Sequence, residues 1–193
     1  MAQGSLPDEP APLAPKTLEG QLREMYGRAA YTHKTHEKMA DRYVCRYKTI
    51  KVAEIAISAL ASSSLIIAIF GDSRPATIIG AVLSAAVLAL TLYFKEANLG
   101  EQAQKHSEVA SKLWGIREAL LSLLVDMKDG RALNDVRSER DRLNVALEEI
   151  YKGAPRTDCV AYAAAQRALK EGELYFSEEE LDKMLPKQLR RNA

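Results

Sequence analysis

Two long uncharged segments, separated by one short polar turn, constrain the fold of this chain more than any other feature. No charged residue occurs from Ile55 to Phe70 or from Ala76 to Phe94, and the five residues 71–75 between them are typical of a turn. At about 1.5 Å of rise per residue, the second segment reaches roughly 28 Å, close to the hydrocarbon thickness of a bilayer, about 30 Å. The first segment reaches a similar length if it begins at Val52, which places Glu54 at the boundary.

Neither segment has the charged face that a surface helix of a soluble protein requires. Their polar members are hydroxyl residues alone, namely Ser58, Ser62, Ser63, Ser64, Thr77, Ser84 and Thr91. The alternative is a soluble helical bundle with this hairpin at its core. A chain of 193 residues has too little other apolar surface to enclose two such helices. We therefore predict a transmembrane hairpin over residues 52–94, with spans 52–70 and 76–94.

The basic residues near the hairpin predict its orientation. The side that carries both chain ends has Arg42, Arg46, Lys48, Lys51 and Lys95, whereas the connecting loop has only Asp72 and Arg74. By the positive-inside rule, the N- and C-termini are predicted to be cytosolic.

Over the whole chain, 27 Lys and Arg residues nearly balance 26 Asp and Glu residues, which argues against a nucleic-acid partner.

The remaining residues divide into three predicted regions. Residues 1–16 contain four of the seven prolines and are predicted to be a disordered tail. Residues 17–51 contain no proline and are predicted to form a juxtamembrane cytosolic helix that runs into the first span. Residues 95–193 are predicted to form a cytosolic helical domain. The predicted fold class is therefore all-α.

Apolar residues at helical spacing locate the cytosolic helices. One stripe precedes the hairpin, with Leu18, Leu22, Met25, Ala29 and Thr32. A second stripe continues from the second span, with Leu99, His106, Val109, Leu113, Leu120, Leu124 and Met127, and ends at Asp129 and Gly130. These two helices are predicted to pair as a stalk.

Three shorter helices are predicted to follow. The first places Val136, Leu143, Leu147 and Ile150 inward and breaks at residues 152–155. The second is capped by Thr157, carries Val160, Ala164 and Leu169, and stops at Gly172. The last begins with a capping box of Ser177 and Glu180 and is stopped by Pro186.

Two sets of small or hydroxyl residues in the hairpin are candidate functional positions. Ala81, Ala85 and Ala89, with Ala59 and Ser63, recur at four-residue spacing and are predicted to mark helix-packing faces, because small side chains let helices approach closely in lipid. Thr77, Ser84 and Thr91 lie seven residues apart. They either line a pore between subunits or hydrogen-bond locally to the helix backbone.

Two charged residues are predicted to mark the membrane boundary. Counting symmetrically about the turn places Glu54 level with residues 92–95, so an ion pair with Lys95 is one expectation. The other is that the Glu54 carboxylate reaches the interface beside Lys51, since a lone charge in hydrocarbon is costly.

No motif in the chain predicts catalysis or a cofactor. His33 and His36, followed by Glu37, share a helical face but lack a further ligand at the spacing of a known zinc helix. Neither Cys45 nor Cys159 has metal or redox spacing. We therefore predict no catalytic residues, no metal and no cofactor, and the chain is not expected to be an enzyme.

The order of a juxtamembrane helix, a two-span hairpin and a helical tail resembles the SLATT family, the prokaryotic SMODS- and SLOG-associating two-transmembrane effectors. The similar positions are Tyr31, His33, His36 and Tyr43 before the first span, Ala103, His106, Trp114 and Arg117 after the second, and Ala154, Pro155, Thr157, Ala161, Tyr162 and Gln166 in the tail. The resemblance covers roughly residues 17 to 190 and rests on architecture and scattered positions.

The resemblance implies a membrane effector of a bacterial anti-phage or conflict system, located in the bacterial inner membrane. It implies a nucleotide-signalling or sensor protein as partner, and assembly into a homo-oligomeric pore that disrupts the membrane on a signal. The alternative is a membrane-anchored helical adaptor that recruits a protein partner without forming a pore.

Overall fold

The computed structural model describes residues 17–71 and 73–191, so the predicted tail and Asp72 lie outside the described residues. Over these residues the chain is helical, without strands. The helices are α1 (Leu18–Gly71), α2 (Arg74–Ala97), α3 (Leu99–Lys128), α4 (Leu133–Gly153), α5 (Cys159–Lys170) and α6 (Glu178–Met184), followed by a 3-10 turn, η1 (Lys187–Leu189). The all-α prediction is confirmed.

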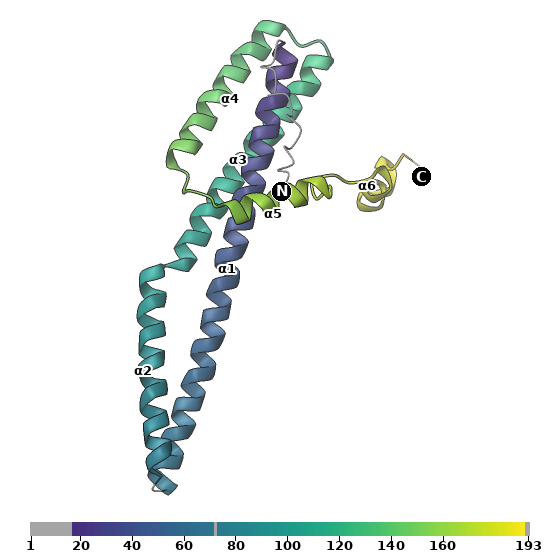
Figure 1. The fold of residues 1–193 in the computed structure, drawn as a ribbon. Helices are drawn as coiled ribbons and strands as arrows, with labels where there is room; N and C mark the ends of the chain where they lie inside the picture. Colours follow the sequence, from purple (N-terminus) through teal and green to yellow (C-terminus); the bar gives the residue numbers. More distant parts are fainter. Residues whose placement is uncertain (1–16, 72, 192–193) are drawn as a thin grey trace, which may run out of the picture.

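The longest element, α1, is one uninterrupted helix of 54 residues, or about 80 Å at 1.5 Å per residue. The absence of proline predicts this continuity, because proline would remove a backbone donor and break the helix. The second half of α1 lies antiparallel to α2, and the two helices extend together from the rest of the molecule (Figure 1). We call residues 52–94 the hairpin and the remaining helices, with the first half of α1, the helical body.

A single residue, Asn98, separates α2 from α3, although the apolar pattern predicts one continuous helix there. Its backbone has φ 41° and ψ 44°, the left-handed region that asparagine adopts more readily than most residues. Its side-chain amide donates a hydrogen bond to Glu101 in the first turn of α3. The break changes the direction of the chain, so α2 and α3 meet at an angle along the same partner, α1 (Figure 1).

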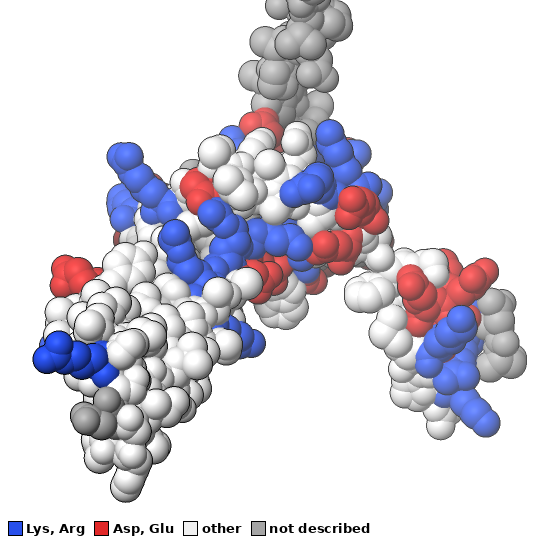
Figure 2. All heavy atoms as spheres, turned by 60° about the horizontal axis from the view of Figure 1, so that its bottom comes forward, with Lys and Arg blue, Asp and Glu red and all other residues white. Residues whose placement is uncertain are grey.

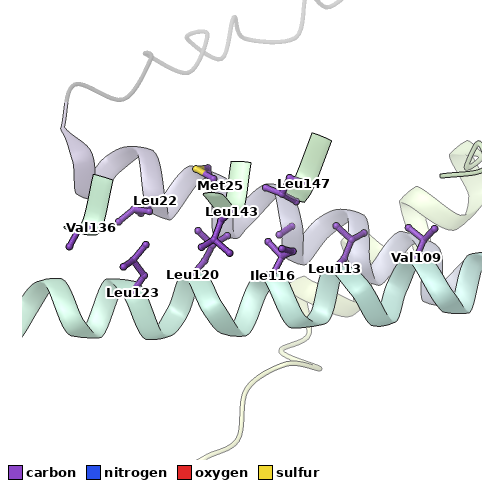
Figure 3. Close-up of a cluster of buried hydrophobic side chains, with 11 residues drawn as sticks. Leu22, Met25, Val109, Leu113, Ile116, Leu120, Leu123, Val136, Leu143 and Leu147 are labelled. Carbon is purple, nitrogen blue, oxygen red and sulfur yellow. The ribbon is translucent and has the colours of Figure 1, made fainter. Parts of the chain in front are cut away.

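The core of the helical body lies between α1, α3 and α4 (Figure 3). Its buried members are Leu22, Met25 and Ala29 from α1, Val109, Leu113, Ile116, Leu120 and Leu123 from α3, and Val136, Leu143 and Leu147 from α4. These side chains lie on the stripes that the sequence predicts to face inward, apart from Ile116 and Leu123. The predicted pairing of α1 and α3 as a stalk is confirmed.

The start of α5 differs from its prediction by one residue. Asp158, rather than Thr157, is the N-cap, and its carboxylate accepts a hydrogen bond of 2.8 Å from the Ala161 N–H. The buried face of α5 also differs. It consists of Ala161, Ala165 and Ala168, which allow α5 to cross closely over α1, while Val160 is 55% exposed.

The other helix ends that the sequence predicts are confirmed. Gly130 and Gly172 follow α3 and α5 with φ of 94° and 82°, conformations that side chains other than glycine rarely adopt. Ser177 and Glu180 form both hydrogen bonds of a capping box at the start of α6, which ends before Pro186.

Candidate functional site

Few residues of the hairpin are buried within the chain. In the most apolar 18-residue window of each of its two helices, only 6% of the residues are buried. Figure 2 shows this part of the molecule as a white surface with few charged groups. A hairpin at the core of a soluble bundle would be mostly buried, so the length, composition and exposure are those of membrane-spanning helices.

Close packing between the two hairpin helices depends on Ala61 and Gly80, the two buried residues among those that the structure describes in this segment. A methyl group added at Gly80 would lie 3.4 Å from Leu65 Cδ2 and 3.5 Å from the Ser64 Cβ. The backbones therefore approach closely here, as small residues allow in membrane helices.

The predicted helix-packing residues lie elsewhere on the hairpin. Ala59 and Ser63 in α1, and Ala81, Ala85 and Ala89 in α2, are exposed in the single chain. Ala59 and Ser63 are each two residues from buried Ala61, which places them about 160° around the helix from it. These small residues are therefore free to contact another helix, and a packing role between subunits stays a prediction.

Most hydroxyl groups in the hairpin hydrogen-bond to the preceding turn of their own helix. Thr77 donates to the Ser73 carbonyl and Thr91 to the Val87 carbonyl, and the four serines of the first segment do the same with Glu54, Ser58, Ala59 and Leu60. Among the seven serines and threonines of the two apolar segments 55–70 and 76–94, exposed Ser84 is the one with no such bond. A pore-lining role for Thr77, Ser84 and Thr91 remains untested.

A small polar cluster lies at the base of the hairpin. The Thr91 hydroxyl shares its one hydrogen between the Val87 carbonyl and Glu54 Oε1, which lies 2.8 Å from it, and Glu54 Oε2 pairs with Lys51 Nζ at 3.0 Å. The Lys51 ammonium also lies 4.6 Å from the centre of the Phe94 ring. Glu54 therefore takes Lys51 as its partner, the second of the two arrangements that the sequence allows, and the structure shows no ion pair between Glu54 and Lys95.

Basic side chains surround this base. The residues are Arg42, Arg46, Lys48, Lys51 and Lys95, and Figure 2 shows Lys and Arg side chains gathered where the hairpin meets the helical body. Arg42 forms an ion pair with Asp158, which joins α1 to the start of α5. The Ala161 N–H and then the Arg42 guanidinium hold the pKa of Asp158 below its usual range.

A pair of buried histidines lies between α1 and α3, on the body side of this basic region. The Nδ1 atoms of His36 and His106 are 2.9 Å apart, and the two residues are 2% and 1% exposed. The Tyr43 ring stacks on the His106 ring, with 5.6 Å between the ring centroids. One Nδ1 must donate and the other accept, so the accepting ring is neutral in this arrangement. Burial and then the charge of His106 lower the pKa of His36 to about 4, and burial lowers the pKa of His106.

Sequence reasoning missed this pair, because it considered His36 beside His33. His33 instead lies 3.4 Å from Glu37, and its Nδ1 is buried with no hydrogen-bond partner. Among the described residues, no group of three or more potential metal ligands comes together. The available signal was His106 on the inward stripe of α3, opposite the α1 stripe, whose spacing continues from Thr32 to His36.

Comparison with known proteins gives one family match. Residues 18–180 match the model of the SMODS and SLOG-associating 2TM effector domain family 4. No curated protein and no solved structure matches the chain. The matched range includes the hairpin, the histidine pair and the core of the helical body. The chain belongs to the family of SMODS and SLOG-associating 2TM effector domains.

Proposed function

We propose that this protein is a membrane effector of a bacterial conflict system, in which several hairpins assemble into a pore through the inner membrane. The observation that carries the proposal is a hairpin of two long apolar helices with few buried residues, on a chain of the 2TM effector family. We further propose that both termini are cytosolic, because the basic residues gather at the base of the hairpin. A sensor protein or a nucleotide signal would act on the helical body.

The positions of the small residues support assembly of hairpins side by side. In α1, Ala59 and Ser63 face away from α2. In α2, Ala85 and Ala89 lie about 140° and 180° around the helix from Gly80, and so face away from α1. Each hairpin thus has a small-residue face on both outer edges. Contact between the α1 edge of one copy and the α2 edge of the next is a head-to-tail interface, which can close into a ring.

We propose that the hydroxyl residues of α2 line the lumen of such a ring, beside the contacts between neighbouring hairpins. Thr77, Ser84 and Thr91 share one stripe, about 20° to 60° around α2 from Gly80, at the edge of the side that faces α1. In a closed ring this stripe can face the lumen, where water would satisfy a Ser84 hydroxyl that lacks a bond in the single chain. In lipid the same hydroxyl would have to bond to its own helix.

Replacing Ser84 by leucine tests the pore directly. We expect Ser84→Leu to insert normally but to reduce conductance in reconstituted liposomes to the level of protein-free vesicles, because a ring of leucines would dewet the lumen. The same variant should no longer collapse the membrane potential of cells at high expression, as reported by a potential-sensitive dye.

Ile79→Leu is the matched control, since Ile79 is 52% exposed on the same helix and lies outside both the hydroxyl stripe and the small-residue face. It should retain conductance. A membrane-anchored adaptor would tolerate both substitutions, and its wild-type form would leave vesicles sealed under every activating condition, which would refute the pore.

A further inference from the structure

A cavity of 680 Å³ lies beside α1 at the base of the hairpin. Its walls come from the body half of α1, from Tyr93 near the end of α2, and from Asp158 at the start of α5. It therefore lies where the hairpin, α1 and α5 meet. Neither the pore nor the core of the helical body uses this space.

The cavity extends from the apolar edge of the hairpin toward the helical body. Ile50 and Tyr93 line its hairpin end, and Arg46 lies four residues, or about 6 Å, further from the hairpin than Ile50. The headgroup layer on each side of a bilayer is about 5–8 Å thick. If the hairpin spans the membrane, the Arg46 guanidinium lies at the level of the lipid phosphates, while Ile50 and Tyr93 border the acyl chains.

The charges around the cavity leave Arg46 available for an anion. The structure shows Arg42 and Asp158, which also line the cavity, paired with each other. Arg46 is exposed and forms no ion pair with any carboxylate of residues 17–71 or 73–191. A guanidinium offers several donors in a planar fork, which matches the oxygens of a phosphate group.

The lining also favours a lipid over a small soluble anion. Ile50, Met39 and the rings of Tyr43 and Tyr93 give the cavity an apolar wall next to its basic group. A phospholipid presents the same combination, a phosphate followed by acyl chains. Tyrosine is common at this depth, since its ring is apolar and its hydroxyl is polar.

We propose that this cavity binds the headgroup of an anionic phospholipid, with Arg46 holding the phosphate and with Ile50 and Tyr93 against the first part of the acyl chains. The proposal rests on the membrane insertion of the hairpin proposed above. The bound lipid would lie between α1 and the start of α5, and so would link the helical body to the membrane surface.

Lipid retention by the full-length protein tests this site. The protein is reconstituted in nanodiscs of phosphatidylcholine with a minor fraction of phosphatidylglycerol, and the bound phosphatidylglycerol is counted by native mass spectrometry after extraction into detergent. We expect the wild type to retain phosphatidylglycerol selectively. Arg46→Gln should weaken retention about tenfold, as the loss of a charged hydrogen bond predicts, and Arg46→Lys should restore part of it.

Lys48→Gln is the matched control. It removes one positive charge two residues away, outside the cavity and on another face of α1, so it should change retention less than twofold. Equal losses in Arg46→Gln and Lys48→Gln would mean general surface charge and would overturn the site. Displacement of the lipid by millimolar inorganic phosphate would also overturn it, in favour of a soluble anion.

The lipid-retention test and the conductance test of the proposed pore give results that can be told apart. Selective lipid retention in a protein that leaves liposomes sealed would support the lipid site and refute the pore. Conductance from a protein whose lipid retention does not depend on Arg46 would support the pore and refute the lipid site. Circular dichroism should show unchanged helicity in the Arg46 variants, because this side chain makes no ion pair in the fold.

Discussion

Replacing Leu120 by alanine is expected to lower the free energy of unfolding of the helical body by about 2 to 5 kcal/mol. Leu120 is fully buried in α3, within the core that α1 and α4 share with it (Figure 3). The substitution removes apolar contacts and leaves a cavity that three helices cannot easily fill. Denaturant unfolding in detergent measures the change through Trp114, the single tryptophan, which lies on the same helix.

Leu121→Ala is the control for this core. Leu121 follows Leu120 directly but is 44% exposed, so its truncation should cost less than about 1 kcal/mol. Both variants have the same composition and the same change in helix propensity. Equal destabilisation by the two substitutions would contradict the assignment of the buried face of α3.

Acidification from pH 7 to pH 5 is expected to destabilise the helical body by about 2 kcal/mol through His36 alone. The unfolded chain binds a proton on this side chain as the pH falls through about 6.5. The folded chain does not until the pH falls to about 4, because burial and then the charge of His106 lower the pKa of His36. The unfolded state thus binds more protons in this window, and stability falls with pH.

His106 and His33 add to the same trend, since burial is the largest cause of a lowered pKa in both. Nearby carboxylates oppose this lowering in part. Asp158 raises the pKa of His106, and Glu37 is the main group that raises the pKa of His33. Carboxylates contribute mainly below pH 5, so the window from pH 7 to pH 5 isolates the histidines.

Thermal unfolding of the wild type and of His36→Gln at several pH values measures the effect. The variant should be less stable at pH 8, because it loses the bond to His106, yet its stability should depend less steeply on pH. A wild-type melting temperature that stays constant from pH 7 to pH 5 would refute the assignment of these rings as buried and neutral.

In α1, α3 and α4, helix positions and inward faces were predictable from the sequence because each of these helices has one apolar side in the body. The stripes of α1, α3 and α4 led directly to the core residues Leu22, Leu113 and Leu143. Ends of helices were predictable where glycine or a capping box occurs, as at Gly130 and Ser177. In these places local chemistry and tertiary packing favour the same conformation.

Features that depend on contacts between distant residues were not predictable. The break at Asn98 leaves the apolar periodicity intact, so the pattern does not reveal the change in direction. Thr157 and Asp158 are both competent caps, and the structure gives Asp158 an ion pair with Arg42 in another helix. The pairing of His36 with His106 depends on how α1 and α3 are aligned along their length, which no local pattern specifies.

In the candidate site, composition predicted the hairpin but not its internal alignment. Counting from the turn places Glu54 level with residues 92–95, whereas its carboxylate bonds to Thr91, about one helical turn short of Lys95. The two small residues that pack within the hairpin, Ala61 and Gly80, were not among the five predicted from four-residue spacing. Their packing depends on the rotation of each helix about its axis, which the spacing does not specify.

Thiol accessibility at the tip of the hairpin tests the central claim, that residues 52–94 cross a membrane with both termini on one side. Cys45 and Cys159 are free and exposed in the helical body, and Ser73 lies in the turn between the two apolar helices. In right-side-out vesicles of a Ser73→Cys variant, a membrane-impermeant maleimide should label the introduced thiol at once and the two native cysteines only after permeabilisation. Labelling of all three thiols only after permeabilisation, or of all three in intact vesicles, would contradict a hairpin that crosses the bilayer.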